Sequence, residues 1–254
     1  MNWSARQYSA FERERTRPVR DLVAALPHSE IAVGVDLGCG PGNSTEVLAA
    51  RYPTARISGL DNSEDMLQAA RQRLPAIDFA LADIARWVSE RPCDVILANA
   101  SLQWLPDHDR LYPHLVEQLL PGGCLAVQTP DNLEEPAHRM AREIAAHGPW
   151  AAKIRDLRHP PRHSAEHYYA ILSGHCREVD VWRTIYFHPL DGGAQAVVEW
   201  FKGSALRPYL ARLDEAERAG FLEAYRVAME QAYPPAPDGK VLLPFPRLFL
   251  VATR

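Results

Sequence analysis

The chain has 254 residues, a length that suits one α/β domain with an insertion better than two full domains. Hydrophobic residues make up 47% of it and charged residues 24%, which excludes extended disorder, collagen-like repeats and coiled coils. The 28 lysines and arginines against 32 acidic residues give a formal net charge of −4, which provides no general attraction for a polyanion. We therefore expect no nucleic-acid partner.

The cysteines and the hydropathy pattern bear on location. The 4 cysteines are far apart and form no CxxC pair, which argues against a zinc knot. Residues 1–20 contain arginines but no apolar core of a signal peptide, and the sequence has no run of 18 apolar residues. We expect a cytoplasmic protein with reduced thiols, no bound metal and no membrane partner.

Between Ile31 and Thr129, short apolar runs alternate with helical patterns, which is typical of βαβ units and a parallel sheet. Before them, 3.6-residue spacing predicts two helical pieces from Tyr8 to Leu26. Five strands are expected, at 31–37, 55–61, 77–81, 94–99 and 124–129. Helices are expected around 45–49, from 62 or 63 to 70, and over 111–120, where Pro121-Gly122-Gly123 ends the last of them.

The second half of the chain is less regular. Residues 149–161 are predicted to form a loop, and residues 178–187, rich in β-branched and aromatic side chains, are predicted to form a strand. Helices over 194–201 and 214–233, a turn at 237–240 and a last strand around 248–252 complete the chain. The segment between the last two strands is long enough to form a helical cap.

The strongest local motif places Gly38, Gly40 and Gly42 at a turn from strand to helix, where a backbone without Cβ atoms can approach a ligand closely. The dinucleotide motif GxGxxG is one residue longer, and a carboxylate at Asp36 would repel a pyrophosphate but suit a cation. Asp61 ends the second strand near the spacing at which an acid reaches ribose hydroxyls. These features favour an adenosine with a positive charge, whereas a tight turn with packed glycines is the alternative.

With VDLGCGPGNST at 35–45, LDNS at 60–63 and ADI at 82–84, the sequence resembles the class I S-adenosylmethionine-dependent methyltransferases. The resemblance implies a Rossmann-like, doubly wound α/β fold, whose mostly parallel seven-stranded sheet has an antiparallel last strand and carries a helical substrate cap. It divides the single domain 1–254 into an N-terminal helical lid at 1–28, a cofactor-binding core at 29–147, and the cap with the last two strands at 148–254.

The same resemblance implies S-adenosylmethionine as cofactor and assigns its contacts. The glycine loop would pass the methionine part, with Asp36 orienting the amino group through the loop. Asp61 would bind the ribose, Met66 would lie on the adenine, and Asp83 with Ile84 would meet its edge. The full set of cofactor-binding candidates is Asp36, Gly38, Cys39, Gly40, Asn43, Asp61, Asn62, Met66, Asp83, Ile84, Asn99, Ser101 and Trp104.

The substrate is suggested by the segments outside the glycine loop. The fourth strand is not followed by the Asn/Asp-Pro-Pro-aromatic motif of methyltransferases that act on DNA amino groups. In chain order, segments 99–108, 113–116, 130–132, 178–184, 206–208 and 246–249 resemble bacterial O-methyltransferases of a small tricarboxylate. The resemblance implies a carboxyl O-methyltransferase that forms a monomethyl ester.

The chemistry of such a reaction needs few protein groups. A carboxyl group titrates near pH 4, so the nucleophile is ionised at neutral pH without a general base. The sequence contains no GxSxG motif, so we interpret Ser101 as a pocket contact and assign no catalytic residue. Methyl transfer is then an in-line displacement that depends on alignment and on the exclusion of water.

A trianionic substrate calls for guanidinium and hydroxyl donors, because arginine binds carboxylates in bidentate fashion. We expect the arginines to hold the carboxylates that are not methylated. The substrate-binding candidates are Tyr8, Trp104 as an apolar wall, Arg183, Tyr186, Arg207 and Tyr209. His163 and His167 are spaced i, i+4 but have no third ligand in register, which favours ordinary surface histidines over a metal site.

Three alternatives remain open. The first is a methyltransferase of the same fold that acts on another small acid, an amine or a carbon nucleophile. The second is a non-catalytic protein that binds the cofactor or a partner. The third, a nicotinamide oxidoreductase, is disfavoured by the glycine spacing. We expect a monomer.

Overall fold

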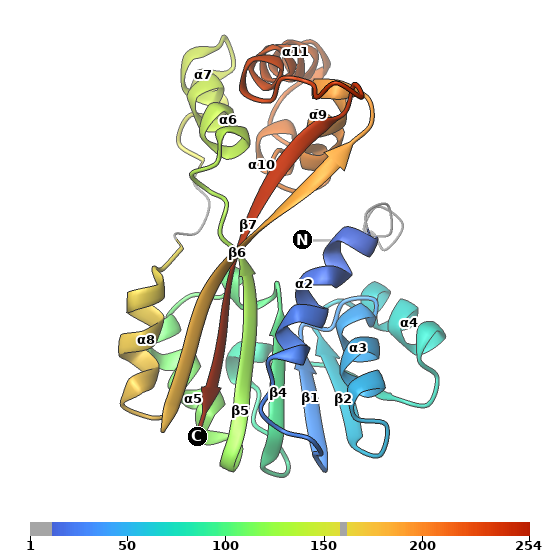
Figure 1. Cartoon of the computed structure of the whole chain (residues 1–254). Helices are drawn as coiled ribbons and strands as arrows, with labels where there is room; N and C mark the ends of the chain where they lie inside the picture. Colours follow the sequence, from blue (N-terminus) through green and yellow to red (C-terminus); the bar gives the residue numbers. More distant parts are fainter. Residues whose placement is uncertain (1–11, 158–161) are drawn as a thin grey trace. The chain divides into compact units, whose positions relative to one another are not determined.

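The computed structural model describes residues 12–157 and 162–254, with side chains from Thr16 onward (Figure 1). The chain divides into two compact units. The first comprises residues up to Pro130, residues 162–184 and residues 247–254, and the second comprises residues 131–161 and 185–246. The boundary predicted after residue 147 lies within the second unit, and the division into lid, core and cap stays a prediction.

The described residues contain one seven-stranded sheet in the order β3-β2-β1-β4-β5-β7-β6. Strands β1 to β5 pair in parallel, and β7 pairs with β5 in the antiparallel sense. The strands are β1 Val33–Leu37, β2 Arg56–Asp61, β3 Asp78–Leu81, β4 Cys93–Asn99, β5 Leu119–Pro130, β6 Glu178–Leu190 and β7 Val241–Thr253. The predicted fold class, with its mostly parallel sheet and antiparallel last strand, is confirmed.

The helices alternate with these strands in the first half of the chain and cluster in the second unit (Figure 1). In the first unit they are α2 Glu12–Ala24, α3 Asn43–Arg51, α4 Glu64–Arg73, α5 His108–Glu117 and α8 Ala165–Ser173, with 3-10 turns η2 Ile84–Arg86 and η3 Leu102–Trp104. In the second unit they are α6 Pro136–His147, α7 Ala151–Ile154, α9 Gly193–Lys202, α10 Arg207–Leu210 and α11 Glu215–Ala232.

The central strands form the core of the first unit because they are apolar on both faces, as parallel strands covered on both sides must be. In β4, Val95, Ile96, Leu97 and Ala98 are fully buried. Neighbouring positions on β5 are equally buried, and α5 packs its apolar side into the same cluster. This core fixes the carboxyl ends of β1, β2 and β4, where the predicted site lies.

The helix predicted over 111–120 is wrong at its end. The helix α5 ends at Glu117, and Leu119 already pairs with Cys93 of β4. The ladder is irregular between Cys93 and Val95, and Gly122 adopts a φ of 85°, so Pro121-Gly122-Gly123 lies inside β5 instead of terminating a helix. A glycine at positive φ within a strand is a common feature of a bulge.

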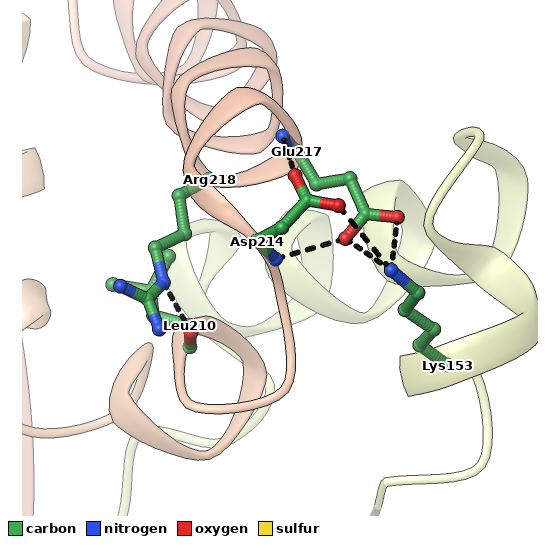
Figure 2. Close-up of polar contacts among 5 residues, drawn as sticks. All are labelled: Lys153, Leu210, Asp214, Glu217 and Arg218. Carbon is green, nitrogen blue, oxygen red and sulfur yellow. Dashed lines mark hydrogen bonds and ion pairs between the residues drawn. The ribbon is translucent and has the colours of Figure 1, made fainter.

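In the second unit, a helix cap and two ion pairs lie at the start of α11 (Figure 2). Asp214, the first residue of the helix predicted over 214–233, caps α11: its Oδ1 accepts from the backbone N–H of Glu217, and the Glu217 carboxylate accepts from the N–H of Asp214. Lys153 of α7 donates to Glu217 at 2.7 Å and to Asp214 at 3.5 Å. These exposed ion pairs contribute little, whereas the cap stabilises the helix by about 1 kcal/mol.

Among residues 12–157 and 162–254, we find no helix whose length and apolar character would allow it to cross a membrane. The predicted cytoplasmic location and monomeric state stay predictions.

Candidate functional site

The glycine loop joins β1 to α3 and has an unusual backbone. Gly38, Gly40 and Gly42 have φ values of 72°, 55° and 89°, in the left-handed region that glycine tolerates best. A Cβ on Gly38 would lie 2.3 Å from Cβ of Ser101, and one on Gly42 would lie 3.3 Å from Cα of Ala70. A Cβ on Gly40 would meet no described atom within 4 Å. Two glycines therefore allow close packing, and the third faces open space beside the loop.

Asp61, the last residue of β2, holds this loop in place. Its Oδ2 accepts from the backbone N–H of Gly40 at 2.9 Å, and its Oδ1 accepts from the N–H of Ser63 at 2.9 Å. Burial raises the pKa of Asp61, and the backbone donors of Gly40, Ser63 and Asn62 oppose that rise. A carboxylate has about four acceptor positions, so acceptor capacity remains for ligand hydroxyls.

Asp36 on β1 is fully buried beneath the loop. Its Oδ2 accepts hydrogen bonds from the hydroxyls of Ser44 and Thr45, both at 2.7 Å, in the first turn of α3. Its Oδ1 accepts none from the described residues. Burial raises the pKa of Asp36 to about 6. A cationic donor group of a ligand would supply a hydrogen bond to Oδ1 and a positive charge opposite the carboxylate.

The remaining candidates around β2 and β3 differ in burial. Cys39 packs with Leu67 and Phe79 in a small apolar cluster, and burial raises the pKa of its thiol. Met66 is buried, whereas Asn62 and Asp83 are exposed. Asp83 caps η2 by accepting from the N–H of Ala85 at 3.0 Å, and the next residue, Ile84, is half-buried. Half-buried Asn43 begins α3.

The segment after β4 is fastened to the glycine loop. Ser101 donates from Oγ to the carbonyl of Leu37, the last residue of β1, at 2.6 Å. Ala100 has a φ of 55°, a strained value for a residue with a Cβ, and its N–H donates to the carbonyl of Gln128 at 2.8 Å. Trp104 in η3 is 45% exposed, with the guanidinium of Arg162 at 6.0 Å from its ring.

Two buried polar residues at this edge have no place in the predicted site. Gln128 of β5 is fully buried and donates from Nε2 to Oδ1 of Asn99 at 2.6 Å. Arg247 of β7 is 5% exposed and donates from Nη1 to Oε1 of Gln128 at 2.7 Å. Their sequence signal is a polar residue within an otherwise apolar strand, which indicates burial with a partner but not which partner.

His108 at the start of α5 is a third buried polar group that the sequence did not indicate. Its Nε2 lies 3.0 Å from the carbonyl of Leu102 in η3, and its Nδ1 lies 2.9 Å from the hydroxyl of Tyr168 on α8. Because a carbonyl can only accept, Nε2 carries the hydrogen and Nδ1 of the neutral ring accepts from Tyr168. His163, whose ring stacks on His167 at 4.1 Å, has its centroid 5.1 Å from that of His108.

This histidine group predicts acid sensitivity. Burial, followed by the charges of His163 and Arg162, lowers the pKa of His108, while the Leu102 carbonyl opposes the change. A folded state that binds this proton more weakly than the unfolded chain is fully stabilised above about pH 6.5, and stability falls as the pH drops below it. We expect the urea midpoint of His108→Gln to change less between about pH 7.5 and 5.5 than that of the parent chain, and equal slopes would contradict this.

The substrate candidates are divided between the units. Trp104 and Arg183 belong to the first unit, where Arg183 is exposed on β6. Tyr186 on β6 and Arg207 and Tyr209 on α10 belong to the second unit. Both tyrosines are buried and Arg207 is half-buried. Tyr8 lies outside the described residues.

A glycine loop on a parallel sheet, with one acid next to the end of β1 and another at the end of β2, is the arrangement of the class I methyltransferases. Residues 35–123 match a family model described as a methyltransferase domain. The YcgJ protein from Bacillus subtilis has a similar fold, with a TM-score of 0.59 at 12% identity, covering 95% of this chain and 98% of that one. The chain is a class I methyltransferase that uses S-adenosylmethionine.

More similar relatives define the family further. Trans-aconitate 2-methyltransferase of Methylobacterium radiotolerans is 52% identical over 257 residues, covering 100% of this chain and 98% of the relative. The protein of the same name from Rhizobium rhizogenes is 49% identical over 256 residues and is covered completely, as is this chain. The chain belongs to the family of the trans-aconitate 2-methyltransferases.

Proposed function

We propose that this chain transfers the methyl group of S-adenosylmethionine to a carboxylate of trans-aconitate and forms its monomethyl ester. The observation that carries the proposal is the similarity over the full chain, at 52% and 49% identity, to two proteins that bear this name. The geometry of the glycine loop and its two acids is compatible with a cationic adenosine ligand. Other small acids remain the main alternative.

Cofactor binding rests on the acids at the strand ends. Asp61 has acceptor positions left for the ribose hydroxyls, and it also fixes the backbone of Gly40. The Oδ1 atom of Asp36, which accepts no hydrogen bond from the described residues, would orient the ammonium group of the cofactor through the glycine loop. Met66 would contact the adenine face, and Asp83 with Ile84 the adenine edge. The whole set of cofactor contacts predicted from the sequence is retained in this proposal.

The transfer itself moves no proton. A carboxylate oxygen attacks the methyl carbon in line with the departing sulfur, the carbon–sulfur bond breaks, and the electron pair stays on sulfur as S-adenosylhomocysteine. The positive sulfonium and the negative carboxylate neutralise each other, so a site without water favours the step. Alignment of the two reactants supplies several kcal/mol more. We assign no general base, because the carboxylate is already ionised at neutral pH.

We assign substrate binding to Arg183 and Arg207. The other candidates are Trp104 and the tyrosines Tyr8, Tyr186 and Tyr209. A charge-assisted bond from guanidinium to carboxylate is worth about 1.5–3 kcal/mol. Arg183→Ala and Arg207→Ala are therefore each expected to raise KM for trans-aconitate roughly 10- to 100-fold. Steady-state kinetics with saturating cofactor measures this. Arg212→Ala, an exposed position close to Arg207, is the control, and unchanged KM in both test variants would contradict the assignment.

The decisive experiment is mass spectrometry of the product formed from S-adenosylmethionine and trans-aconitate, with citrate and isocitrate in parallel. A product heavier by one methyl group in place of one proton, formed far faster from trans-aconitate, is the expected result. Equal transfer to unrelated acids would favour a broader acid methyltransferase. Cofactor binding by calorimetry without transfer to any acid would favour a non-catalytic binding protein.

A further inference from the structure

Three polar side chains on neighbouring strands of the first unit, Arg247, Gln128 and Asn99, form a line of hydrogen bonds that we call the relay. Arg247 on β7 donates to Gln128 on β5 at 2.7 Å, and Gln128 donates to Asn99 on β4 at 2.6 Å. Arg247 is 5% exposed and Gln128 is fully buried, so water contributes little to this arrangement. Asn99 is the half-buried end of the line.

The direction of this relay is set at its buried end. A guanidinium only donates, so the oxygen of the Gln128 amide must face Arg247 and its NH2 group must face Asn99. That NH2 group requires an acceptor, which fixes the amide oxygen of Asn99 toward Gln128. The two orientations of an isolated amide are otherwise hard to distinguish. Here the NH2 group of Asn99 is the part of its amide that the relay leaves for a ligand.

Asn99 is placed beside the cofactor loop. It is the last residue of β4, and the next two residues are held by bonds from Ala100 to the Gln128 carbonyl and from Ser101 to Leu37. Leu37 directly precedes Gly38, whose backbone is close to Ser101. The carboxyl ends of parallel strands, where this asparagine lies, are where open α/β sheets bind ligands.

We propose that Arg247 and Gln128 are positioning residues, which fix Asn99 as a hydrogen-bond donor to a ligand carboxylate. This role of Asn99 rests on the proposed function, because both ligands of the proposed reaction carry carboxylates. They are the amino-acid end of S-adenosylmethionine and the acidic substrate. Hydrogen bonds in a chain polarise one another, so the donor at the end is strengthened by the guanidinium behind it. An asparagine that presented its oxygen would repel either carboxylate.

Gln128→Glu reverses the relay with almost no change in shape. The new carboxylate accepts from Arg247 and from Asn99, so the Asn99 amide turns over and presents its oxygen to the ligand. We expect the dissociation constant of one ligand to rise about 10- to 100-fold, as for the loss of a bond to a charged group. Calorimetry with S-adenosylmethionine tests the cofactor arm. Calorimetry with trans-aconitate on protein saturated with S-adenosylhomocysteine tests the substrate arm.

A double-mutant cycle separates positioning from a structural effect. In an Asn99→Ala background the donor is already gone, so Gln128→Glu should weaken neither ligand further. Gln118→Glu makes the same charge change on the α5–β5 connection and should leave both affinities unchanged, while thermal unfolding confirms that every variant is folded. An added loss in the Asn99→Ala background, or wild-type affinity for both ligands in folded Gln128→Glu, would overturn the relay.

The outcome is distinct from that of the proposed function. If the parent chain binds no trans-aconitate, the proposed substrate fails and the cofactor arm alone decides the relay. If the parent chain methylates trans-aconitate and Gln128→Glu binds both ligands normally, the substrate stands and the relay fails.

Discussion

Replacement of Asp36 with asparagine is expected to make the folded chain more stable at neutral pH and to weaken cofactor binding. Asp36 is fully buried, and its pKa is raised from 3.8 to about 6. A raised folded-state pKa favours folding below pH 3.8, and that benefit is lost as the pH rises through about 6. Above pH 6 the buried charge costs about 3 kcal/mol, from roughly 1.4 kcal/mol per pKa unit.

Asparagine removes this charge and can still bond to the hydroxyls of Ser44 and Thr45. We expect Asp36→Asn to raise the free energy of unfolding by about 1–3 kcal/mol near pH 7.5, and the gain to disappear near pH 3.5, below the unfolded-state pKa. Urea unfolding at both values measures it. The cofactor, having lost the counter-charge of its ammonium group, should bind at least about tenfold more weakly by calorimetry.

The control for this change is Asp94→Asn. Asp94 accepts from the N–H groups of Ala32 and Val33, both at 2.8 Å, at the opposite end of the first strands. It should lower stability slightly and leave cofactor affinity unchanged. Two outcomes would contradict this prediction. One is an Asp36→Asn variant that is less stable than the parent chain at neutral pH, and the other is a variant with the parent's affinity for the cofactor.

The second large effect is expected for Asp61→Ala. The change removes the acceptors proposed for the ribose and also the anchor of the Gly40 backbone at 2.9 Å. Loss of one or two charge-assisted hydrogen bonds should weaken S-adenosylmethionine about 100-fold. Calorimetry and a thermal shift at one fixed cofactor concentration both report the loss, because the stabilisation by a ligand grows with the logarithm of its concentration divided by Kd.

Two variants calibrate this result. Asp61→Asn keeps one oxygen acceptor for Gly40 and should lose less affinity than alanine. Asp78→Ala removes the acid of an exposed ion pair with Arg56 on the neighbouring strand and should leave affinity unchanged. Cofactor affinity of Asp61→Ala within about twofold of the parent chain would reject Asp61 as the ribose ligand.

The strands and the helices between them in the first half of the chain were predictable because their signals are local, whereas α7 Ala151–Ile154 lies where a loop was predicted. The glycine loop, the acids at 36 and 61, and the alternation of apolar runs with helical patterns each lie within a few residues. They predicted the βαβ units and the parallel part of the sheet. The end of α5 was mispredicted because the Pro-Gly-Gly sequence suits both a helix stop and a bulged strand.

The sequence by itself determined the βαβ units and the glycine loop, since these depend on periodicity and on contiguous motifs, and the same motifs carry the resemblance to the family. Only the tertiary structure decided the bonds across strands. Asn99, Gln128 and Arg247 are separated by 29 and 119 positions in the chain, yet they form one relay. His108 and Tyr168 meet across 60 positions. The physical reason is that pairing of buried polar groups is set by sheet order and helix packing, which a linear pattern does not encode.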